Sequence, residues 1–185
     1  MTKSDLSLGF VGLGALGLPM AINLHRAGFK LRVHSRSRTA ETSPELEGAV
    51  RCSSPADAST GVDVLLLCVS DDAAVEDVLF GPNGAASELI AGSVVLDCST
   101  IAPATVQRCA ERLERQNVHY LDAPVTGGTE GAKRGSLTVL VGGASEQMER
   151  IRPILEVIGG SIHHFGSVGR GQQVKAVNQV LVAGS

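Results

Sequence analysis

The near-continuous aliphatic run from Val62 to Val69 constrains the fold most, because a strand that is apolar on both faces has to be covered on both sides. Such strands are typical of parallel sheets that carry helices on each face. The rest of the chain alternates in the same sense between short apolar runs and helical stretches. We predict further strands at Leu6–Gly12, Lys30–His34, Ser93–Asp97, Val118–Leu121, Leu137–Val141 and Ser161–Phe165. We predict helices over Ala15–Arg26, Ala73–Leu79, Pro103–Gln116 and Glu146–Ile158, and again from about Gln172. This alternation predicts an α/β fold with a doubly wound, mostly parallel sheet.

Two segments of the chain do not fit this alternation. Residues 39–60 are polar and are broken by Pro44 and Pro55, so short helices and loops are expected there. Gly127–Gly135 is a glycine-rich stretch that we interpret as a turn between strands.

Composition excludes several classes of partner. The 185 residues carry a formal net charge of -3, so nothing indicates a nucleic-acid partner. The run at Val62–Val69 is too short to cross a bilayer, and Met1–Asp5 carry no secretory signal. The four cysteines lack the spacing of zinc ligands, and we interpret them as reduced and buried. We therefore expect a cytoplasmic protein with no membrane partner and no metal site.

A glycine pattern lies between the first predicted strand and the first predicted helix. Gly12, Gly14 and Gly17 fit G-x-G-x-x-G, in which the first glycine permits a tight turn and the second lets the backbone approach a pyrophosphate. The third allows close packing of helix on strand, and the helix N-terminus faces the anion. The pattern predicts a Rossmann-like dinucleotide site formed by Gly12, Leu13, Gly14, Ala15, Leu16 and Gly17.

The end of the second predicted strand distinguishes the two nicotinamide dinucleotides. NAD sites place Asp or Glu there to accept a hydrogen bond from the ribose 2′-hydroxyl. The segment Val33–Arg38 contains no acid, and carries two hydroxyls and two guanidiniums at Ser35, Arg36, Ser37 and Arg38. Arginine binds phosphate through paired charged hydrogen bonds. The sequence therefore favours NADP(H) over NAD(H).

Three later segments complete a pattern that runs over nearly the whole chain. They are Asp122–Gly128, Gly131–Gly143 and Gly169–Gln179. Together with the glycine loop and Pro19–Ala21, they resemble the 3-hydroxyisobutyrate dehydrogenase family of β-hydroxyacid dehydrogenases. The resemblance is strongest to the tartronate semialdehyde (2-hydroxy-3-oxopropionate) reductase and glyoxylate/succinic semialdehyde reductase branches. It implies an NADP-dependent oxidoreductase that interconverts a short-chain β-hydroxyacid and its semialdehyde.

The resemblance also implies roles for individual residues. It makes Lys175 the catalytic lysine, which protonates the carbonyl oxygen in reduction and takes the proton back in oxidation. This agrees with the chemistry, because hydride transfer leaves an alkoxide that a neighbouring cation stabilises. Asn178 and Gln179 fall on the same motif and are expected to bind substrate or to orient the lysine.

The remaining site residues lie on the turns after predicted strands. Thr126, Gly127 and Gly128 match an element that binds the substrate carboxylate, and a hydroxyl beside exposed N–H groups can hold an anion. Val69, Ser70 and Thr100 match cofactor contacts at the carboxyl edge of the sheet. We expect the carboxylates near these turns to be structural. Asp71 or Asp72 is expected to cap the following helix, and Asp122 to hold loop backbone.

Two other functions share these motifs. A 6-phosphogluconate dehydrogenase-like enzyme has the fold and a lysine, but Asn178-Gln179 stands where that enzyme has His-Asn. Imine reductases, which are enzymes of the same superfamily, usually replace the lysine, whereas Lys175 is present. A non-catalytic NADP-binding homologue is a separate alternative, and it too is expected to lack the lysine.

The resemblance further implies a division of the chain. Residues 1–166 are expected to form the NADP-binding domain, and residues 167–185 the start of an interdomain helix that leads into a helical domain. The last helix stops in mid-pattern, with an apolar stripe at Val180–Ala183. The helical domain, absent from this sequence, is expected to complete the pocket for a small carboxylate substrate and to form a homo-oligomer.

Overall fold

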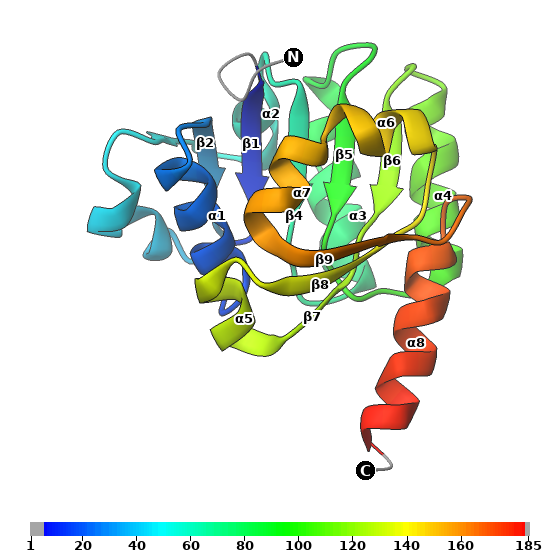
Figure 1. Cartoon of the computed structure of the whole chain (residues 1–185). Helices are drawn as coiled ribbons and strands as arrows, with labels where there is room; N and C mark the ends of the chain where they lie inside the picture. Colours follow the sequence, from blue (N-terminus) through cyan, green and yellow to red (C-terminus); the bar gives the residue numbers. More distant parts are fainter. Residues whose placement is uncertain (1–5, 184–185) are drawn as a thin grey trace.

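The computed structural model describes residues 6–183 (Figure 1). Residues 1–5, on which the expectation about a secretory signal depends, lie outside them. The strands are β1 (Ser7–Val11), β2 (Lys30–His34), β3 (Val50–Arg51), β4 (Val64–Leu67), β5 (Val94–Asp97), β6 (His119–Asp122), β7 (Val125–Thr126), β8 (Leu137–Val141) and β9 (Gly159–His164). The α-helices are α1 (Gly17–Arg26), α2 (Pro55–Ser59), α3 (Asp72–Phe80), α4 (Pro103–Glu114), α5 (Gly128–Arg134), α6 (Ser145–Arg150), α7 (Arg152–Ile158) and α8 (Arg170–Ala183). Short 3-10 helices are η2 (Ala40–Thr42), η3 (Pro44–Leu46) and η4 (Ala85–Ser87).

The first six strands form one parallel sheet in the order β3-β2-β1-β4-β5-β6. Leu8 of β1 pairs with Leu31 of β2 on one side and with Val64 of β4 on the other. Successive strands are added outward in opposite directions from β1 and β4, so the connections diverge at their carboxyl ends. Ligands of doubly wound sheets bind in the crevice at that point. The predicted fold class is confirmed.

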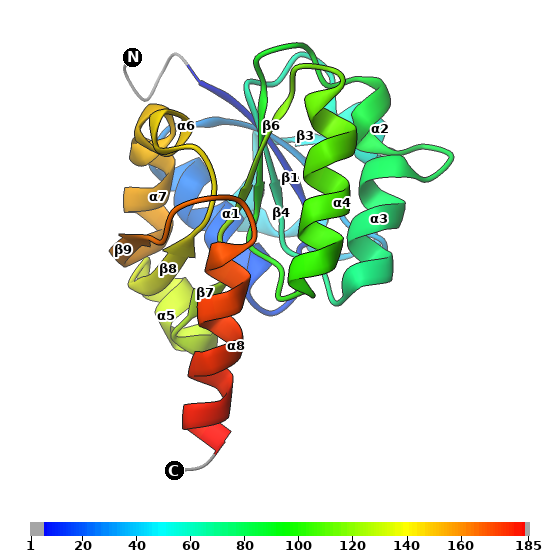
Figure 2. The same ribbon diagram turned by 90° about the vertical axis from the view of Figure 1, so that its right-hand side faces the viewer.

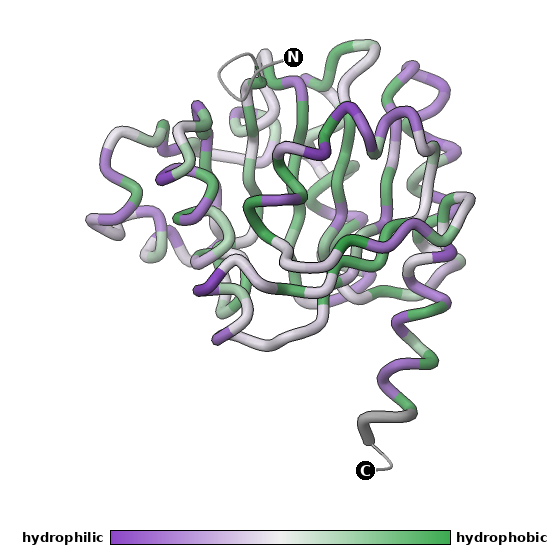
Figure 3. The backbone as a smooth tube through the Cα atoms, viewed as in Figure 1, coloured by the Kyte–Doolittle hydropathy of each residue, from purple (hydrophilic) through white to green (hydrophobic). Residues whose placement is uncertain are grey.

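Helices cover both faces of this sheet, as the aliphatic run at β4 requires. Helices α1, α6 and α7 lie on one face, and α2, α3 and α4 lie on the other (Figure 2). Alternate residues of β4 pack against the helices on opposite faces of the sheet. Leu66 packs into the cluster that contains α1 and α7, and Leu65 packs into the cluster that contains α3 and α4. Figure 3 shows the resulting pattern, with hydrophobic strands at the centre and hydrophilic stretches on the outer helices.

A second, three-stranded sheet, in the order β7-β8-β9, follows the first. Strand β7 is antiparallel to β8, and β9 is parallel to it. The stretch Gly127–Gly135, interpreted as a turn, instead contains the helix α5. This helix forms because Gly131 and Ala132 are buried, with Gly131 set close against the Leu137 side chain, and because Gly135 ends the helix in the left-handed region at φ +63.

Two other predictions from the sequence need correction. The single helix expected over Glu146–Ile158 is two helices, α6 and α7, which meet at Ile151. Pro153 explains the break, because its nitrogen carries no hydrogen to donate to the carbonyl of the preceding turn. Within the polar stretch 39–60, Val50–Arg51 adds the edge strand β3, which is too short and too exposed to leave an apolar pattern.

Helix α8 begins at Arg170 and projects away from the body of the domain (Figures 1 and 2). Its start agrees with the helix predicted from about Gln172. Val177 and Val180 are 63% and 73% exposed, whereas the Leu181–Ala183 part of the predicted apolar stripe has side chains outside the described residues. No helix within residues 6–183 has the length and apolar character needed to cross a bilayer.

Candidate functional site at the carboxyl edge of the sheet

The loop between β1 and α1 can be built only with glycine at two positions. Gly12 has φ +99, and a Cβ atom on it would lie 2.2 Å from the carbonyl oxygen of Cys68. A Cβ on Gly17, where α1 begins, would lie 1.9 Å from the carbonyl oxygen of Gly12. Gly14, in contrast, faces open space, since nothing lies within 4 Å of the corresponding position. The loop therefore leaves room for a ligand to approach its backbone at Gly14.

The turn after β2 is organised by a residue that the sequence analysis did not identify. Ser35 is buried, and its N–H donates to Oε1 of Glu41 at 2.6 Å. Arg38 pairs with Oε2 of the same carboxylate at 3.1 Å. Arg36, Ser37 and Arg38 are all exposed, but Arg36 has no such ion pair within the described residues. The strand end does have an acid beside it, although it comes from η2, six residues beyond Ser35. An acid shortly after a basic turn is the only signal in the sequence that could have suggested this arrangement.

The turns after β4 and β5 are joined to each other. The N–H of Val69 donates to Oγ of the buried Ser99 at 3.0 Å, and Thr100 beside it is exposed. Asp71 accepts a hydrogen bond from the N–H of Ala74 at 2.8 Å, which confirms its expected role as the cap of α3. The hydrogen bond from Ser70 holds the pKa of Asp71 below its usual range, and the charge on Arg36 lowers this pKa further.

Three of the predicted substrate and catalytic residues come together. Nζ of Lys175 donates to Oγ1 of Thr126 at 2.9 Å, and Nδ2 of Asn178 donates to the same oxygen at 3.3 Å. Lys175 is 7% exposed, and this burial lowers the pKa of its ammonium group. Gly127 and Gly128 follow Thr126 with φ +132 and +61, values that glycine adopts readily. Gln179 is exposed, and no hydrogen bond joins it to Thr126 within the described residues.

The start of α8 is fixed by Asp122 and Gln172. Asp122, at the end of β6, accepts from the N–H groups of Gly169 at 2.7 Å and Gln172 at 2.9 Å, so its expected structural role is confirmed. The Gln172 side chain donates to the carbonyl of Ser99 at 2.7 Å and accepts from the N–H of Ile101 at 3.3 Å. Gln172 thus joins the helix that carries Lys175 to the turn that holds Thr100. Gln172 lies in the motif segment Gly169–Gln179, but no individual role is predicted for it from the sequence.

A second buried carboxylate, Asp97, ends β5 in the same network. It is 0% exposed, and it accepts hydrogen bonds from the hydroxyl of Tyr120 at 2.5 Å and from the N–H of Ser99 at 2.9 Å. Burial raises the pKa of Asp97 to about 6 from its ordinary value of 3.8.

The pKa of Asp97 leads to a prediction about stability. Because the folded state binds this proton more tightly than the unfolded chain, the stability that it contributes is present below about pH 4 and is lost as the pH rises through about 6. We expect the free energy of unfolding of Asp97→Asn to fall less than that of the parent between pH 4 and 7, by at most about 3 kcal/mol. Urea denaturation at several pH values measures this free energy. Burial also raises the pKa of Asp122, which stays in the variant, so the decline is reduced and not abolished. Parallel stability curves for the variant and the parent would contradict the prediction.

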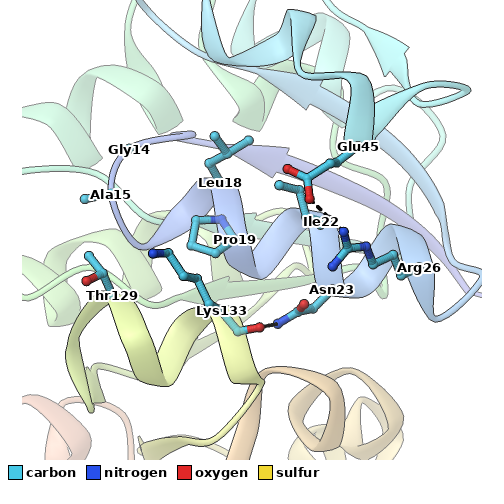
Figure 4. A pocket seen from close by; sticks show the side chains of 10 residues that line it. All are labelled: Gly14, Ala15, Leu18, Pro19, Ile22, Asn23, Arg26, Glu45, Thr129 and Lys133. Atoms are coloured by element: carbon cyan, nitrogen blue, oxygen red, sulfur yellow. Dashed lines mark hydrogen bonds and ion pairs between the residues drawn. The ribbon is translucent and has the colours of Figure 1, made fainter.

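A groove of about 450 Å³ lies along α1, beside the glycine loop (Figure 4). Gly14 and Ala15 line one end, and the ion pair of Arg26 with Glu45 lies at the other. Neither Thr126 nor Lys175 lines it, so this groove is distinct from the place where the predicted catalytic and substrate residues meet.

Residues 6–183 contain no group of three or more His, Cys, Asp or Glu side chains placed to hold a metal ion. All four cysteines are free. Cys52, Cys98 and Cys109 are buried and Cys68 is partly buried. Burial raises the pKa of each thiol, which favours the protonated form.

Comparison with known proteins gives consistent matches. The family described as the NAD binding domain of 6-phosphogluconate dehydrogenase matches residues 7–166. The chain is 40% identical over 178 residues to 2-hydroxy-3-oxopropionate reductase of Escherichia coli, covering 96% of the chain and 61% of that protein. It is 38% identical over 176 residues to NAD-dependent L-serine dehydrogenase of Pseudomonas aeruginosa, covering 95% and 59%.

A solved structure agrees with these relatives. Mycobacterium tuberculosis 3-hydroxyisobutyrate dehydrogenase with L-serine superposes with a TM-score of 0.89 at 30% identity, covering 96% of this chain and 60% of that one. The chain therefore spans about 60% of the length of the proteins that it matches.

Proposed function

The chain belongs to the 3-hydroxyisobutyrate dehydrogenase family, and we propose that it is the cofactor-binding part of an NADP-dependent oxidoreductase that interconverts a short-chain β-hydroxyacid and its semialdehyde. The contact of Lys175 and Asn178 with the single oxygen Oγ1 of Thr126 carries this proposal. It places an ammonium group and a hydroxyl together at the edge of the sheet where ligands of this fold bind.

The residues of the glycine loop fit a dinucleotide. The open space at Gly14 lets a pyrophosphate approach the backbone, and α1 directs its N-terminus toward the same place. Val69, Ser70 and Thr100 lie on the two turns farther along the edge and would contact the rest of the cofactor. When bound, the nicotinamide supplies the hydride in reduction and accepts it in oxidation.

Thr126 is placed to bind the carboxylate of the substrate. Its oxygen already accepts hydrogen bonds from Lys175 and Asn178, so the proton of its hydroxyl remains to be donated. A substrate carboxylate can accept a hydrogen bond from that hydroxyl, and further hydrogen bonds from N–H groups of the turn at Gly127 and Gly128.

Lys175 would then act on the oxygen of the reacting carbonyl. An ammonium group has three protons, and Thr126 uses one of them. As the hydride adds to the carbonyl carbon, the C=O π electrons move to the oxygen, and Lys175 donates a proton from Nζ to form the hydroxyl. In the oxidative direction Lys175 takes that proton back. Burial helps in both directions, because it brings the pKa of the ammonium group closer to neutral pH.

The proposed preference for NADP(H) over NAD(H) depends on Arg36. Arg36 and Ser37 are exposed at the end of β2, where a 2′-phosphate would lie, whereas Arg38 is paired with Glu41. A guanidinium binds this phosphate and makes no comparable contact with the 2′-hydroxyl of NADH.

We expect Arg36→Ala to weaken NADPH binding by about tenfold and to change NADH binding by less than about twofold. Fluorescence titration of the 185-residue chain measures both affinities. Arg115→Ala, which removes an exposed arginine from the end of α4, is the matched control and should change neither. Equal affinity of the parent chain for NADPH and NADH would refute the assignment of NADP.

The substrate class is tested by reduction in the intact protein. Consumption of NADPH is followed with tartronate semialdehyde, methylmalonate semialdehyde, succinic semialdehyde and glyoxylate. Turnover of at least one of these supports the proposal, and turnover of none, with cofactor bound, refutes it. A domain boundary near residue 166, a homo-oligomer built through a helical domain and a cytoplasmic location belong to the same proposal.

A further inference from the structure

Glu41 is a buried carboxylate at the point where the cofactor is expected to be distinguished. It is 2% exposed, although nothing in the local sequence requires an acid in the interior. Oε1 accepts from the N–H of Ser35 at 2.6 Å and lies 3.8 Å from Nδ1 of His34. Oε2 pairs with the Arg38 guanidinium at 3.1 Å. Both oxygens of the carboxylate are therefore used within the turn that follows β2.

Arg38 is held in this arrangement from several sides. Its NH1 donates to the carbonyl oxygen of Cys52, just beyond β3, and lies 3.1 Å from Nδ1 of His34. Its backbone has φ +61, a conformation that side chains other than glycine seldom adopt. The guanidinium thus turns back toward the end of β3, and its charge is neutralised by Glu41 from η2.

Arg36 is arranged differently. It is exposed, and no ion pair engages it within the described residues. Both side chains are exposed, Arg38 by 47%, but Arg38 is paired with a buried carboxylate, so Arg36 is the guanidinium of this turn whose charge no carboxylate of the described residues neutralises.

We propose that Glu41 is a specificity-determining residue that reduces the preference for NADP by withholding Arg38 from the 2′-phosphate. This inference rests on the proposed function, because it concerns the same cofactor site. The carboxylate acts in two ways. It pairs with a cation that the phosphate would otherwise bind, and it sets a negative charge near a ligand group that is itself an anion. NADH carries a neutral hydroxyl at that position, so its affinity does not depend on Glu41 in the same way.

The test is Glu41→Gln, which keeps an acceptor oxygen for the N–H of Ser35 and removes the charge. We expect NADPH to bind about threefold to tenfold more tightly, and NADH to change by less than about twofold. The affinities are measured by fluorescence titration of the 185-residue chain. In the double variant Glu41→Gln with Arg38→Gln, the gain should disappear, because it depends on the released guanidinium.

Glu45→Gln provides the matched control. Glu45 lies in η3, close to Glu41 in sequence, and its substitution changes the net charge by the same amount. Its carboxylate is exposed and pairs with Arg26 at 2.6 Å. This variant should leave the ratio of the two affinities unchanged.

A second substitution guards against loss of folding. In Glu41→Met the new side chain is apolar and similar in volume to glutamate. It can replace Glu41→Gln if the chain does not fold with a buried amide at this position. A ratio of NADPH to NADH affinity that stays the same or falls in the folded variants would overturn the inference. A parent chain that prefers NADH would refute the proposed cofactor instead, and the shift caused by Glu41→Gln would still be measurable.

Discussion

Replacing Lys175 with alanine is expected to lower kcat for semialdehyde reduction by about 10²–10⁴-fold while leaving NADPH affinity nearly unchanged. In the proposed mechanism the Lys175 ammonium group acts on charge that develops only as the hydride is transferred, so its loss should fall on the chemical step. Nζ is 2.9 Å from Oγ1 of Thr126, so it lies beside the hydroxyl proposed to hold the substrate. The measurement is steady-state reduction by the intact protein at saturating NADPH.

Two further variants sharpen this test. Lys175→Arg should also lose most of the parent kcat, because a guanidinium keeps its proton at any working pH and cannot donate it to the substrate oxygen. Lys30→Ala removes an exposed lysine at the start of β2 and should retain full activity. If Lys175→Ala keeps more than about a tenth of the parent kcat, Lys175 is not the general acid.

The direction of the pH dependence follows from burial. In the proposed mechanism reduction needs the protonated lysine, so the rate of reduction should fall as the pH rises through the pKa of Lys175. Desolvation lowers that pKa below 10.5, so the fall should begin at a lower pH than it would for a lysine in water.

Asp122→Ala is expected to produce the largest loss of stability. The Asp122 carboxylate is 0% exposed and accepts from the N–H groups of Gly169 and Gln172. Its removal leaves two buried donors unpaired, at about 1–3 kcal/mol each. For a domain of this size we expect Tm to fall by roughly 5–15 °C.

Calorimetry of the 185-residue chain provides the measurement. Asp77→Ala, an exposed aspartate within α3, is the control and should shift Tm by about 2 °C or less. Asp122→Asn keeps one acceptor oxygen and should give an intermediate loss. An unchanged Tm in Asp122→Ala would show that α8 does not depend on these two hydrogen bonds.

The features that could be predicted from the sequence depend on short-range patterns. The strands of the parallel sheet follow from aliphatic runs such as Val64–Leu67, and the loop at Gly12 follows from spacing that only glycine can satisfy. The meeting of Thr126 and Lys175 was anticipated because the whole order of motifs resembles one family. The first two features follow from the residues themselves, whereas the third required the resemblance, because Thr126 and Lys175 lie 49 positions apart.

The features that were missed depend on contacts between segments that lie apart. Helix α5 forms in a glycine-rich stretch because Gly131 is set against Leu137, a contact that local propensity does not describe. Glu41 contacts Ser35 at the end of β2 although it lies six positions farther along the chain, and residues 33–38 themselves contain no acid. Gln172 reaches Ser99 across 73 positions of sequence.

The attachment of α8 at its first turn makes the helix a lever with its pivot close to the reacting group. A helix rises about 1.5 Å per residue, so Lys175 lies about 4.5 Å along the axis from Gln172, and Ala183 lies about 16 Å from it. A rotation of about 10° about that pivot would displace the backbone of Lys175 by less than about 1 Å and that of Ala183 by about 3 Å. A displacement at the outer end of the helix would therefore be attenuated several-fold at the ammonium group of Lys175, which would keep the alignment that the proposed proton transfer requires.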